Sequence, residues 1–143
     1  MDIRFAEPND LEYLQANDGY VRLEVLQDKI ARGEIVVAVL DGRPVGWLRY
    51  GYFWDTVPFM NRLVVEEAHR GEGWGTRIIQ FWERHLQERG YQWAMTSTQA
   101  DERAQHLYRR LGYRDMGAML WPEDPALEIF LLKQLTPDEG CVS

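Results

Sequence analysis

Three glycines at alternate positions form the segment of this chain best suited to chemistry. Gly71, Gly73 and Gly75 stand in the run HRGEGWGT, between an apolar stretch ending at Val65 and an amphipathic stretch that follows. Glycine adopts backbone conformations closed to other residues and lets the main chain approach a ligand closely. Because a helix is predicted to begin here, several N–H groups lack an intrahelical acceptor and the positive end of the helix dipole points outward. The pattern therefore predicts an anion site suited to phosphate.

Two familiar phosphate motifs do not fit this turn. A dinucleotide fingerprint starting at Gly71 requires a further glycine where the chain has Thr76, and the acidic residue expected about 20 positions later is missing. A GxxxxGK[ST] loop occurs nowhere in the chain. The turn instead matches the pattern Arg/Gln-x-x-Gly-x-Gly/Ala, with Arg70, Gly73 and Gly75 at its defined positions.

A second landmark follows further along the chain. The run LVVEEAHRGEGWGTRIIQFWE, together with the later ADERAQHLYRRLGY, resembles the GNAT superfamily of acyl-CoA-dependent N-acetyltransferases. The pyrophosphate turn and the helix ending A-x-x-L-Y-x-x-L-G-Y agree with that family in order and spacing. The order of predicted strands and helices also fits, so the resemblance covers nearly the whole chain.

The resemblance implies a binding site for acetyl-CoA as co-substrate, with no metal. The turn is expected to wrap the pyrophosphate through its backbone, and the end of the preceding strand is expected to pair with the pantetheine arm. A bulge would splay that strand from its neighbour and leave an N–H facing the thioester carbonyl, where charge develops. The expected coenzyme contacts are Leu63, Val64, Val65, Arg70, Gly71, Glu72, Gly73, Trp74, Gly75, Thr76, Asp101 and Ala104.

Two of these residues depart from the family's pattern. Glu72 stands where a basic residue is often found, and a carboxylate there would weaken coenzyme binding unless its side chain points to solvent. Asp101 stands where the family often has asparagine, and its simpler interpretation is the N-cap of its helix.

Tyr108 matches the tyrosine that the family often places near the coenzyme sulfur as a general acid. The reference pKa of tyrosine is about 10 and that of a thiol about 8.5, so full proton transfer to a departing thiolate is uphill by roughly 2 kcal/mol. We therefore expect Tyr108 to hydrogen-bond the thiolate and to release its proton late. From periodicity alone, Tyr108 is a core aromatic on the apolar stripe of its helix.

The residues that bind and deprotonate the acceptor are less marked in the sequence. A lysine-like amine has a pKa of about 10.4 and must lose its proton before it attacks. Asp55 and Glu66 are the candidate general bases, with Glu102 or a water chain as alternatives. Strand aromatics usually pack, yet an aromatic cluster beside Asp55 could form an amine-binding wall. This cluster consists of Tyr50, Tyr52, Phe53 and Trp54. The candidate acceptor contacts are Tyr52, Phe53, Trp54 and Asn61.

The elements that must position these residues follow from hydrophobic periodicity and turn signals. The segment 59–98 has the pattern strand, helix, strand, whose two strands should be parallel. The fold class is therefore α/β, with a central mixed sheet of about six or seven strands flanked by about four helices. The predicted strands are Asp2–Ala6, Ile35–Leu40, Pro44–Leu48, Phe59–Val65, Gln92–Ser97, Tyr113–Leu120 and Ala126–Lys133. The predicted helices are a short one ending at Ala16, then Tyr20–Arg32, Thr76–Arg89 and Asp101–Leu111.

Composition excludes several classes of protein. With 143 residues and a net charge of −7, the chain lacks the basic excess of a nucleic-acid-binding domain. Its single cysteine, Cys141, excludes a disulfide scaffold, and His69, His85 and His106 are too scattered for a metal site. The longest apolar run is far too short to span a membrane, and the first residues do not form a secretory signal, so we expect a cytoplasmic protein.

These observations predict one GNAT-like domain over residues 1–135 and a flexible tail over 136–143. The predicted function is transfer of an acetyl group from acetyl-CoA to a primary amine, by direct attack in a ternary complex. The acidic charge favours a small cationic amine over a protein acceptor. The alternatives are a peptide or protein N-acetyltransferase, a longer acyl donor, a non-catalytic acyl-CoA sensor and a structural domain. The oligomeric state stays open, although exposed sheet edges allow a homodimer.

Overall fold

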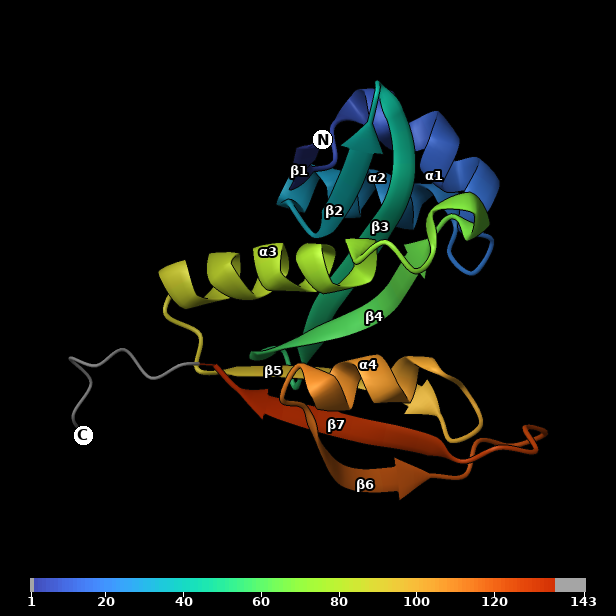
Figure 1. The fold of residues 1–143 in the computed structure, drawn as a ribbon, viewed down its shortest axis with the longest axis vertical. Helices are drawn as coiled ribbons and strands as arrows, with labels where there is room; N and C mark the ends of the chain where they lie inside the picture. Colours follow the sequence, from blue (N-terminus) through green and yellow to red (C-terminus); the bar gives the residue numbers. More distant parts are fainter. Residues whose placement is uncertain (1, 136–143) are drawn as a thin grey trace. The chain divides into compact units, whose positions relative to one another are not determined.

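Seven strands and four α-helices make up residues 2–135, the part of the chain described by this computed structural model (Figure 1). The predicted tail, 136–143, lies outside the described residues. The strands are β1 (Asp2–Phe5), β2 (Ile35–Leu40), β3 (Arg43–Phe53), β4 (Val57–Val65), β5 (Trp93–Gln99), β6 (Arg114–Met119) and β7 (Glu128–Gln134). The helices are α1 (Leu11–Asn17), α2 (Leu23–Arg32), α3 (Trp74–Glu88) and α4 (Ala104–Arg110).

The strands form one mixed sheet in the order β1-β2-β3-β4-β5-β7-β6. β4 and β5 pair in parallel, with Phe59 opposite Met95 and Met60 opposite Thr96. The pairs β1–β2, β2–β3, β5–β7 and β6–β7 are antiparallel. This confirms the predicted α/β fold, with hairpins toward both ends of the sheet and a parallel pair in the middle. The described chain divides into two compact units, residues 2–50 with 62–82 and residues 51–61 with 83–135.

Two tight turns set the lengths of the hairpin strands. Asp41 and Gly42 both have positive φ angles, 52° and 79°, as the predicted two-residue hairpin requires. Trp54 and Asp55 adopt the same conformation, with φ angles of 55° and 62°. This second turn carries no glycine and was missed by the sequence analysis, so β3 and β4 are both longer than predicted.

In the first unit, helices cover both faces of the sheet. Tyr50 of β3 packs against Trp82 of α3, with ring centroids 5.5 Å apart, and Phe5 of β1 meets Phe81 at 5.4 Å. Strand residues alternate between faces, so the neighbours of Tyr50 along β3 face α1 and α2 instead. The buried cluster on that side comprises Ala6, Leu14, Leu26, Ile35, Val37 and Trp47.

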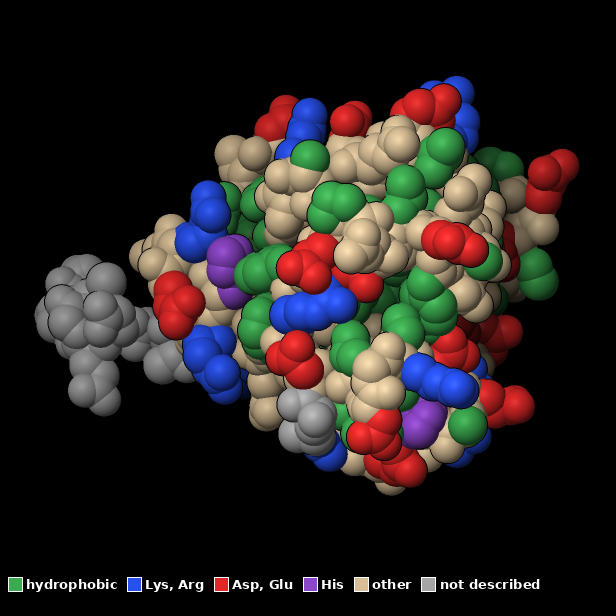
Figure 2. Space-filling model, turned by 90° about the horizontal axis from the view of Figure 1, so that it is seen from above, with side chains coloured by type: hydrophobic (Ala, Val, Ile, Leu, Met, Phe, Trp, Pro, Cys, Tyr) green, Lys and Arg blue, Asp and Glu red, His purple; other side chains and the backbone are tan. Residues whose placement is uncertain are grey.

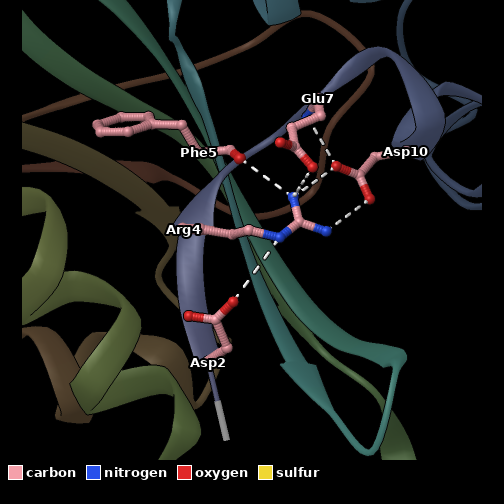
Figure 3. Close-up of polar contacts among 5 residues, drawn as sticks. All are labelled: Asp2, Arg4, Phe5, Glu7 and Asp10. Carbon is pink, nitrogen blue, oxygen red and sulfur yellow. Dashed lines mark hydrogen bonds and ion pairs between the residues drawn. The ribbon is translucent and has the colours of Figure 1, made fainter.

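The first strand is tied to the turn that follows it by one arginine (Figure 3). The guanidinium of Arg4 donates to both carboxylate oxygens of Asp10, at 2.8 and 3.2 Å, and to the Phe5 carbonyl at 3.1 Å. Its ion pairs to Glu7 and Asp2 are longer, 3.6 and 3.9 Å. Arg4 therefore fixes the point where the chain leaves β1 and enters the 3₁₀ turn before α1.

The second helix starts later than predicted. α2 begins at Leu23 rather than Tyr20, while its end at Gly33, with a φ of 71°, is where the sequence placed it. Asp18 is buried and accepts a 2.7 Å hydrogen bond from Arg49 Nε. Because this bond holds the connection to the sheet, the chain after α1 forms a loop before it turns helical again.

The fourth helix is also shorter than predicted, for a local reason. α4 begins at Ala104, its N-cap is Arg103, and Asp101 lies in the preceding turn. The interpretation of Asp101 as the N-cap was therefore wrong. Glu102 accepts a 3.1 Å hydrogen bond from the Gln99 N–H and returns its own N–H to the Gln99 carbonyl at 2.9 Å. These bonds keep the segment in a turn before the helix starts.

The second unit contains a buried carboxylate with two donors. Glu83 accepts hydrogen bonds from the Tyr113 hydroxyl at 2.7 Å and from Lys133 Nζ at 2.8 Å. A buried carboxylate is tolerated only where such partners replace water. The contact joins α3 to β7 and to the residue before β6.

On the face drawn in Figure 2, acidic and basic side chains are interspersed among hydrophobic ones. Within residues 2–135, none of the helices combines the length and apolar character needed to cross a membrane.

A close approach at Gly46 supplies a test of the first unit. A Cβ at Gly46 would lie 2.7 Å from the Val64 carbonyl oxygen and 3.2 Å from Ile78 Cδ1. We expect Gly46→Ala to lower the free energy of unfolding by about 1–3 kcal/mol, because β3, β4 and α3 cannot separate without losing other contacts. Urea denaturation measures this.

Gly117→Ala is the matched control for this test. Gly117 is also a strand residue, but a Cβ there would meet nothing within 4 Å. Equal stability of the two variants would contradict the close packing of β3 on β4.

Candidate active site

The glycine turn before α3 has the conformation that the sequence predicted. Gly71 and Gly73 have positive φ angles of 82° and 87°, which non-glycine residues rarely adopt. Gly75 lies inside α3, which begins at Trp74. Two of the three glycines are therefore required by the backbone of the turn itself.

The turn presents main-chain donors outward. The Arg77 N–H bonds to the Gly73 carbonyl at 3.1 Å, which starts the helical hydrogen-bond pattern. The N–H groups of Trp74, Gly75 and Thr76 precede that bond and have no acceptor within the helix. With the dipole of a 15-residue helix behind them, they suit an anion.

Side chains hold this turn from both sides. Arg70 Nε donates to the Val65 carbonyl at 3.1 Å, and Arg77 Nη2 donates to the Glu72 carbonyl at 3.0 Å. The Arg77 guanidinium also lies over the Trp74 ring, 4.9 Å from its centroid. Both arginines therefore add positive charge at the turn while they stabilise its backbone.

The Glu72 carboxylate is half exposed and has partners of its own. It accepts a 3.1 Å hydrogen bond from Trp74 Nε1 and lies 3.3 Å from His69 Nδ1, while 53% of the side chain remains exposed. A negative charge thus stands at the edge of the predicted anion site.

The end of β4 belongs to the same unit as the turn. Leu63, Val64 and Val65 are partly buried, and Val64 packs against the core cluster under α1 and α2. The next residue, Glu66, donates its N–H to the Val45 carbonyl at 2.8 Å. The predicted pantetheine segment and the predicted pyrophosphate turn therefore follow one another within one unit.

The two candidate bases have different surroundings. Glu66, in the first unit, accepts a hydrogen bond from the Tyr13 hydroxyl. Burial and this carboxylate raise the pKa of Tyr13. Asp55, in the second unit, is exposed in the turn between β3 and β4. Among residues 2–135, a side chain donates to Glu66 and none donates to Asp55.

Tyr108 is buried in the second unit, with 5% of its surface exposed. Burial raises the pKa of Tyr108 to about 12, with the charges of Glu102 and Glu128 acting in the same direction and a hydrogen bond with Thr96 opposing them. The phenol therefore stays protonated at neutral pH. Ala104, a predicted coenzyme contact, opens the same helix, and Asp101 precedes it.

The aromatic cluster does not form a single wall. Tyr52 meets Tyr91 at 5.9 Å, whereas Phe53 meets Trp54 at 4.6 Å and Phe59 at 6.2 Å. Because neighbouring strand residues face opposite ways, Tyr52 lies on one face and Phe53 on the other. Among the acceptor candidates, Trp54 is 79% exposed and Asn61 is also exposed.

One polar cluster was missed by the sequence analysis. Asp18, Arg49 and Arg62 lie together in the first unit, with Arg49 buried beside Asp18. The available signal was Arg49 itself, a charged residue between apolar neighbours in an apolar strand, since arginine is rarely buried without a partner. Within residues 2–135, no group of three or more His, Cys, Asp or Glu side chains is placed to hold a metal ion.

Comparisons with known proteins bear on the family. A family model described as an acetyltransferase (GNAT) domain matches residues 31–115. No curated protein matches the chain. An acetyltransferase of the GNAT family from Bacillus cereus ATCC 10987 superimposes with a TM-score of 0.80 at 19% identity, over 95% of this chain and 98% of that one.

Two further solved structures have named activities. A ribosomal-protein-alanine N-acetyltransferase from Brucella melitensis has a TM-score of 0.80 at 23% identity, over 94% of this chain and 100% of its own. An aminoglycoside 6′-N-acetyltransferase complexed with coenzyme A has a TM-score of 0.77 at 20% identity, over 96% and 99%. At these identities the likeness establishes the fold.

The protonated phenol of Tyr108 predicts a stability change at high pH. A folded pKa of about 12 lies above the unfolded value of about 10, so the contribution of Tyr108 is complete below pH 10 and is lost as pH rises toward 12. Between pH 9 and about pH 11, the free energy of unfolding should therefore fall more in wild type than in Tyr108→Phe. We expect the difference between the two decreases to be about 1 kcal/mol.

Urea denaturation at several pH values measures this difference. Between pH 7 and pH 9, where the Tyr108 phenol is protonated in both states, the difference in unfolding free energy between the two proteins should stay constant, which is the control. Identical slopes for Tyr108→Phe and wild type would show that Tyr108 ionises as readily in the folded state as in the unfolded chain.

Proposed function

The chain belongs to the GNAT family of acetyl-CoA-dependent N-acetyltransferases, and we propose that it acetylates a primary amine by direct attack in a ternary complex. The amine nitrogen bonds to the acetyl carbonyl carbon, the carbon–sulfur bond breaks, and the coenzyme leaves as a thiolate that takes up a proton from solvent afterwards. The observation that carries the proposal is the set of outward N–H groups at the start of α3, which follow Gly71 and Gly73.

The coenzyme is held mainly by the backbone in this proposal. The main chain of Arg70–Thr76 binds the diphosphate, and Arg70 and Arg77 add positive charge beside it. Leu63–Val65 pair with the pantetheine arm, and an N–H of this strand faces the thioester carbonyl as an oxyanion donor. Asp101 and Ala104 make further contacts.

Tyr108 acts as a hydrogen-bond donor to the departing sulfur. With a pKa of about 12 against about 8.5 for a thiol, complete proton transfer from Tyr108 would be uphill by about 5 kcal/mol. A neutral donor stabilises the thiolate in the transition state without that cost. Tyr108 lies in the second unit, so its assignment depends on its match to the family's tyrosine and on its buried, protonated phenol.

The acceptor proton leaves through a carboxylate or through water. Glu66 and Asp55 remain the candidate bases, and Glu66 has Tyr13 as a hydrogen-bonded neighbour. A base of this kind can pass the proton on to solvent, because Glu66 is only partly buried and Asp55 is exposed.

We propose a small-molecule acceptor in preference to a protein. The net charge of −7 favours an approaching ammonium ion, and the exposed Trp54 provides aromatic surface beside the partly buried Phe53. We propose that residues 1–135 form one domain to which both compact units belong. The family match over residues 31–115 includes residues of both units and supports this. A cytoplasmic location and a homodimer remain part of this proposal without bearing on the chemistry.

Thiol release across a library of amines tests the proposal. We expect acetyl-CoA turnover with a subset of small primary amines and a loss of roughly 10²–10⁴-fold in kcat for Tyr108→Phe, because the leaving thiolate loses its donor. Tyr91→Phe, another tyrosine of the second unit, is the control. Turnover with peptides alone would contradict a small-molecule acceptor, and an unchanged kcat in Tyr108→Phe would remove Tyr108 from the mechanism.

Glu72 supplies a separate test of the coenzyme site. We expect Glu72→Gln to bind coenzyme A about three- to tenfold more tightly, because it removes a negative charge beside the diphosphate. Calorimetry at low and high salt measures this, and the gain should shrink as salt rises. Glu88→Gln, at the exposed far end of α3, is the control. Unchanged affinity would place the diphosphate away from this turn.

A further inference from the structure

Two arginines of the first unit converge on one buried carboxylate. Asp18 has a side chain with 0% exposure and accepts hydrogen bonds from Arg49 Nε at 2.7 Å and Nη2 at 3.3 Å. Arg62 Nε lies 3.6 Å from Asp18 Oδ1. Within residues 2–135, Asp18 is the only carboxylate in ion-pair range of either arginine. The cluster therefore keeps one positive charge in excess.

The excess charge resides on Arg62. Its Nε is buried and has no hydrogen-bond partner in the described residues, since 3.6 Å is too long for a hydrogen bond. Buried donors are almost always paired, so an unpaired one indicates a missing acceptor. The Arg62 side chain is 30% exposed overall, so part of it reaches the surface while Nε is enclosed.

The surface around Arg62 is already arranged. The ring of Tyr20, from the loop between α1 and α2, lies over the guanidinium at 4.4 Å from its centroid. Tyr20 is 78% exposed, although a tyrosine ring gains little by standing in water. The ring holds the guanidinium from one face, and a guanidinium held in this way can still bind a planar anion through the N–H groups at its edge.

Arg62 stands next to the proposed reaction centre. It directly precedes Leu63–Val65, the segment proposed to pair with pantetheine, and one strand residue spans about 3.3 Å. Val64, on the same strand face as Arg62, packs against the cluster under α1 and α2. Arg62 and Tyr20 therefore lie on the α1–α2 side of the strand that is proposed to hold the thioester.

We propose that Arg62 binds a carboxylate of the acceptor, so that the substrate is a small amino acid or related amino carboxylate. This rests on the proposed function and selects one class of amine within it. Arginine binds carboxylates with two parallel hydrogen bonds, and it repels polyamines and amino sugars, which lack a carboxylate. The net charge of the chain does not reverse this preference, because distant charges are screened and adjacent ones are not.

A panel of amino acids, each paired with its primary carboxamide, tests the proposal. Thiol release is measured for both members of each pair and compared at equal concentrations of unprotonated amine. We expect kcat/KM for the preferred acid to exceed that of its amide by roughly 10–100-fold in wild type. Arg62→Gln should lose this preference through KM of the acid, with KM for acetyl-CoA unchanged.

Two variants separate recognition from folding. Arg62→Lys keeps the charge and should retain part of the preference for the acid. Arg84→Gln, an exposed arginine of α3, should retain all of it. Equal rates for acids and amides in wild type, or an equal loss for both in Arg62→Gln, would overturn the proposal while leaving acetyl transfer established.

A binding measurement covers the case in which no acceptor turns over. N-acetylated amino acids and their amides are added to the protein with saturating coenzyme A, and the melting temperature is recorded. We expect at least one N-acetyl amino acid to stabilise wild type more than its amide does, and Arg62→Gln to abolish the difference. If no acid stabilises more than its amide, the carboxylate site is wrong whatever the fate of the proposed function.

Discussion

The first turn of a helix cannot satisfy its own N–H groups, and the chemistry proposed for this protein depends on where α3 begins. The positive φ angles at Gly71 and Gly73 bring the chain into the helix with those donors facing outward. Arg70 and Arg77 each donate a hydrogen bond to a backbone carbonyl beside the turn, at 3.1 and 3.0 Å, and so stabilise the turn from both sides. The main chain is therefore the specific part of the proposed anion site, and the arginines contribute an electrostatic attraction that salt screens.

Each carboxylate that this acidic chain buries needs a partner that replaces water. Asp18 is paired with Arg49, and Glu83 with Tyr113 and Lys133. Each pair joins residues far apart in sequence, so the polar groups that would otherwise destabilise the interior specify how its elements meet. The cluster at Asp18 differs because a second arginine approaches the same carboxylate. In the part of the chain that the structure describes, Arg62 therefore has no carboxylate of its own, and it lies beside the proposed substrate strand.

The parts of the fold that could be predicted from sequence are those set by local patterns. The β-branched run of β2, the Asp41-Gly42 turn and the glycine turn before α3 each follow from a few neighbouring residues. The Trp54-Asp55 turn could not be predicted, because two non-glycine residues are held at positive φ by the strands they join. The start of α2 and the partners of Arg62 depend on contacts between distant segments, which no local pattern encodes. The glycine turn and Tyr108 could be proposed as site residues because their motifs have a characteristic spacing, whereas the cluster at Asp18 has no motif.

Binding the acceptor through its own carboxylate suits the chemistry that its amine must undergo. A site that bound the ammonium group through acidic side chains would stabilise the protonated form and so oppose the loss of a proton that attack requires. A site that binds the carboxylate of the substrate gains affinity without stabilising the protonated amine. The positive charge of Arg62 also disfavours a nearby ammonium, which lowers the pKa of the bound amine and increases the fraction ready to attack. The demand on a general base is then smaller, and a half-buried Glu66 or a water molecule is sufficient to accept the proton.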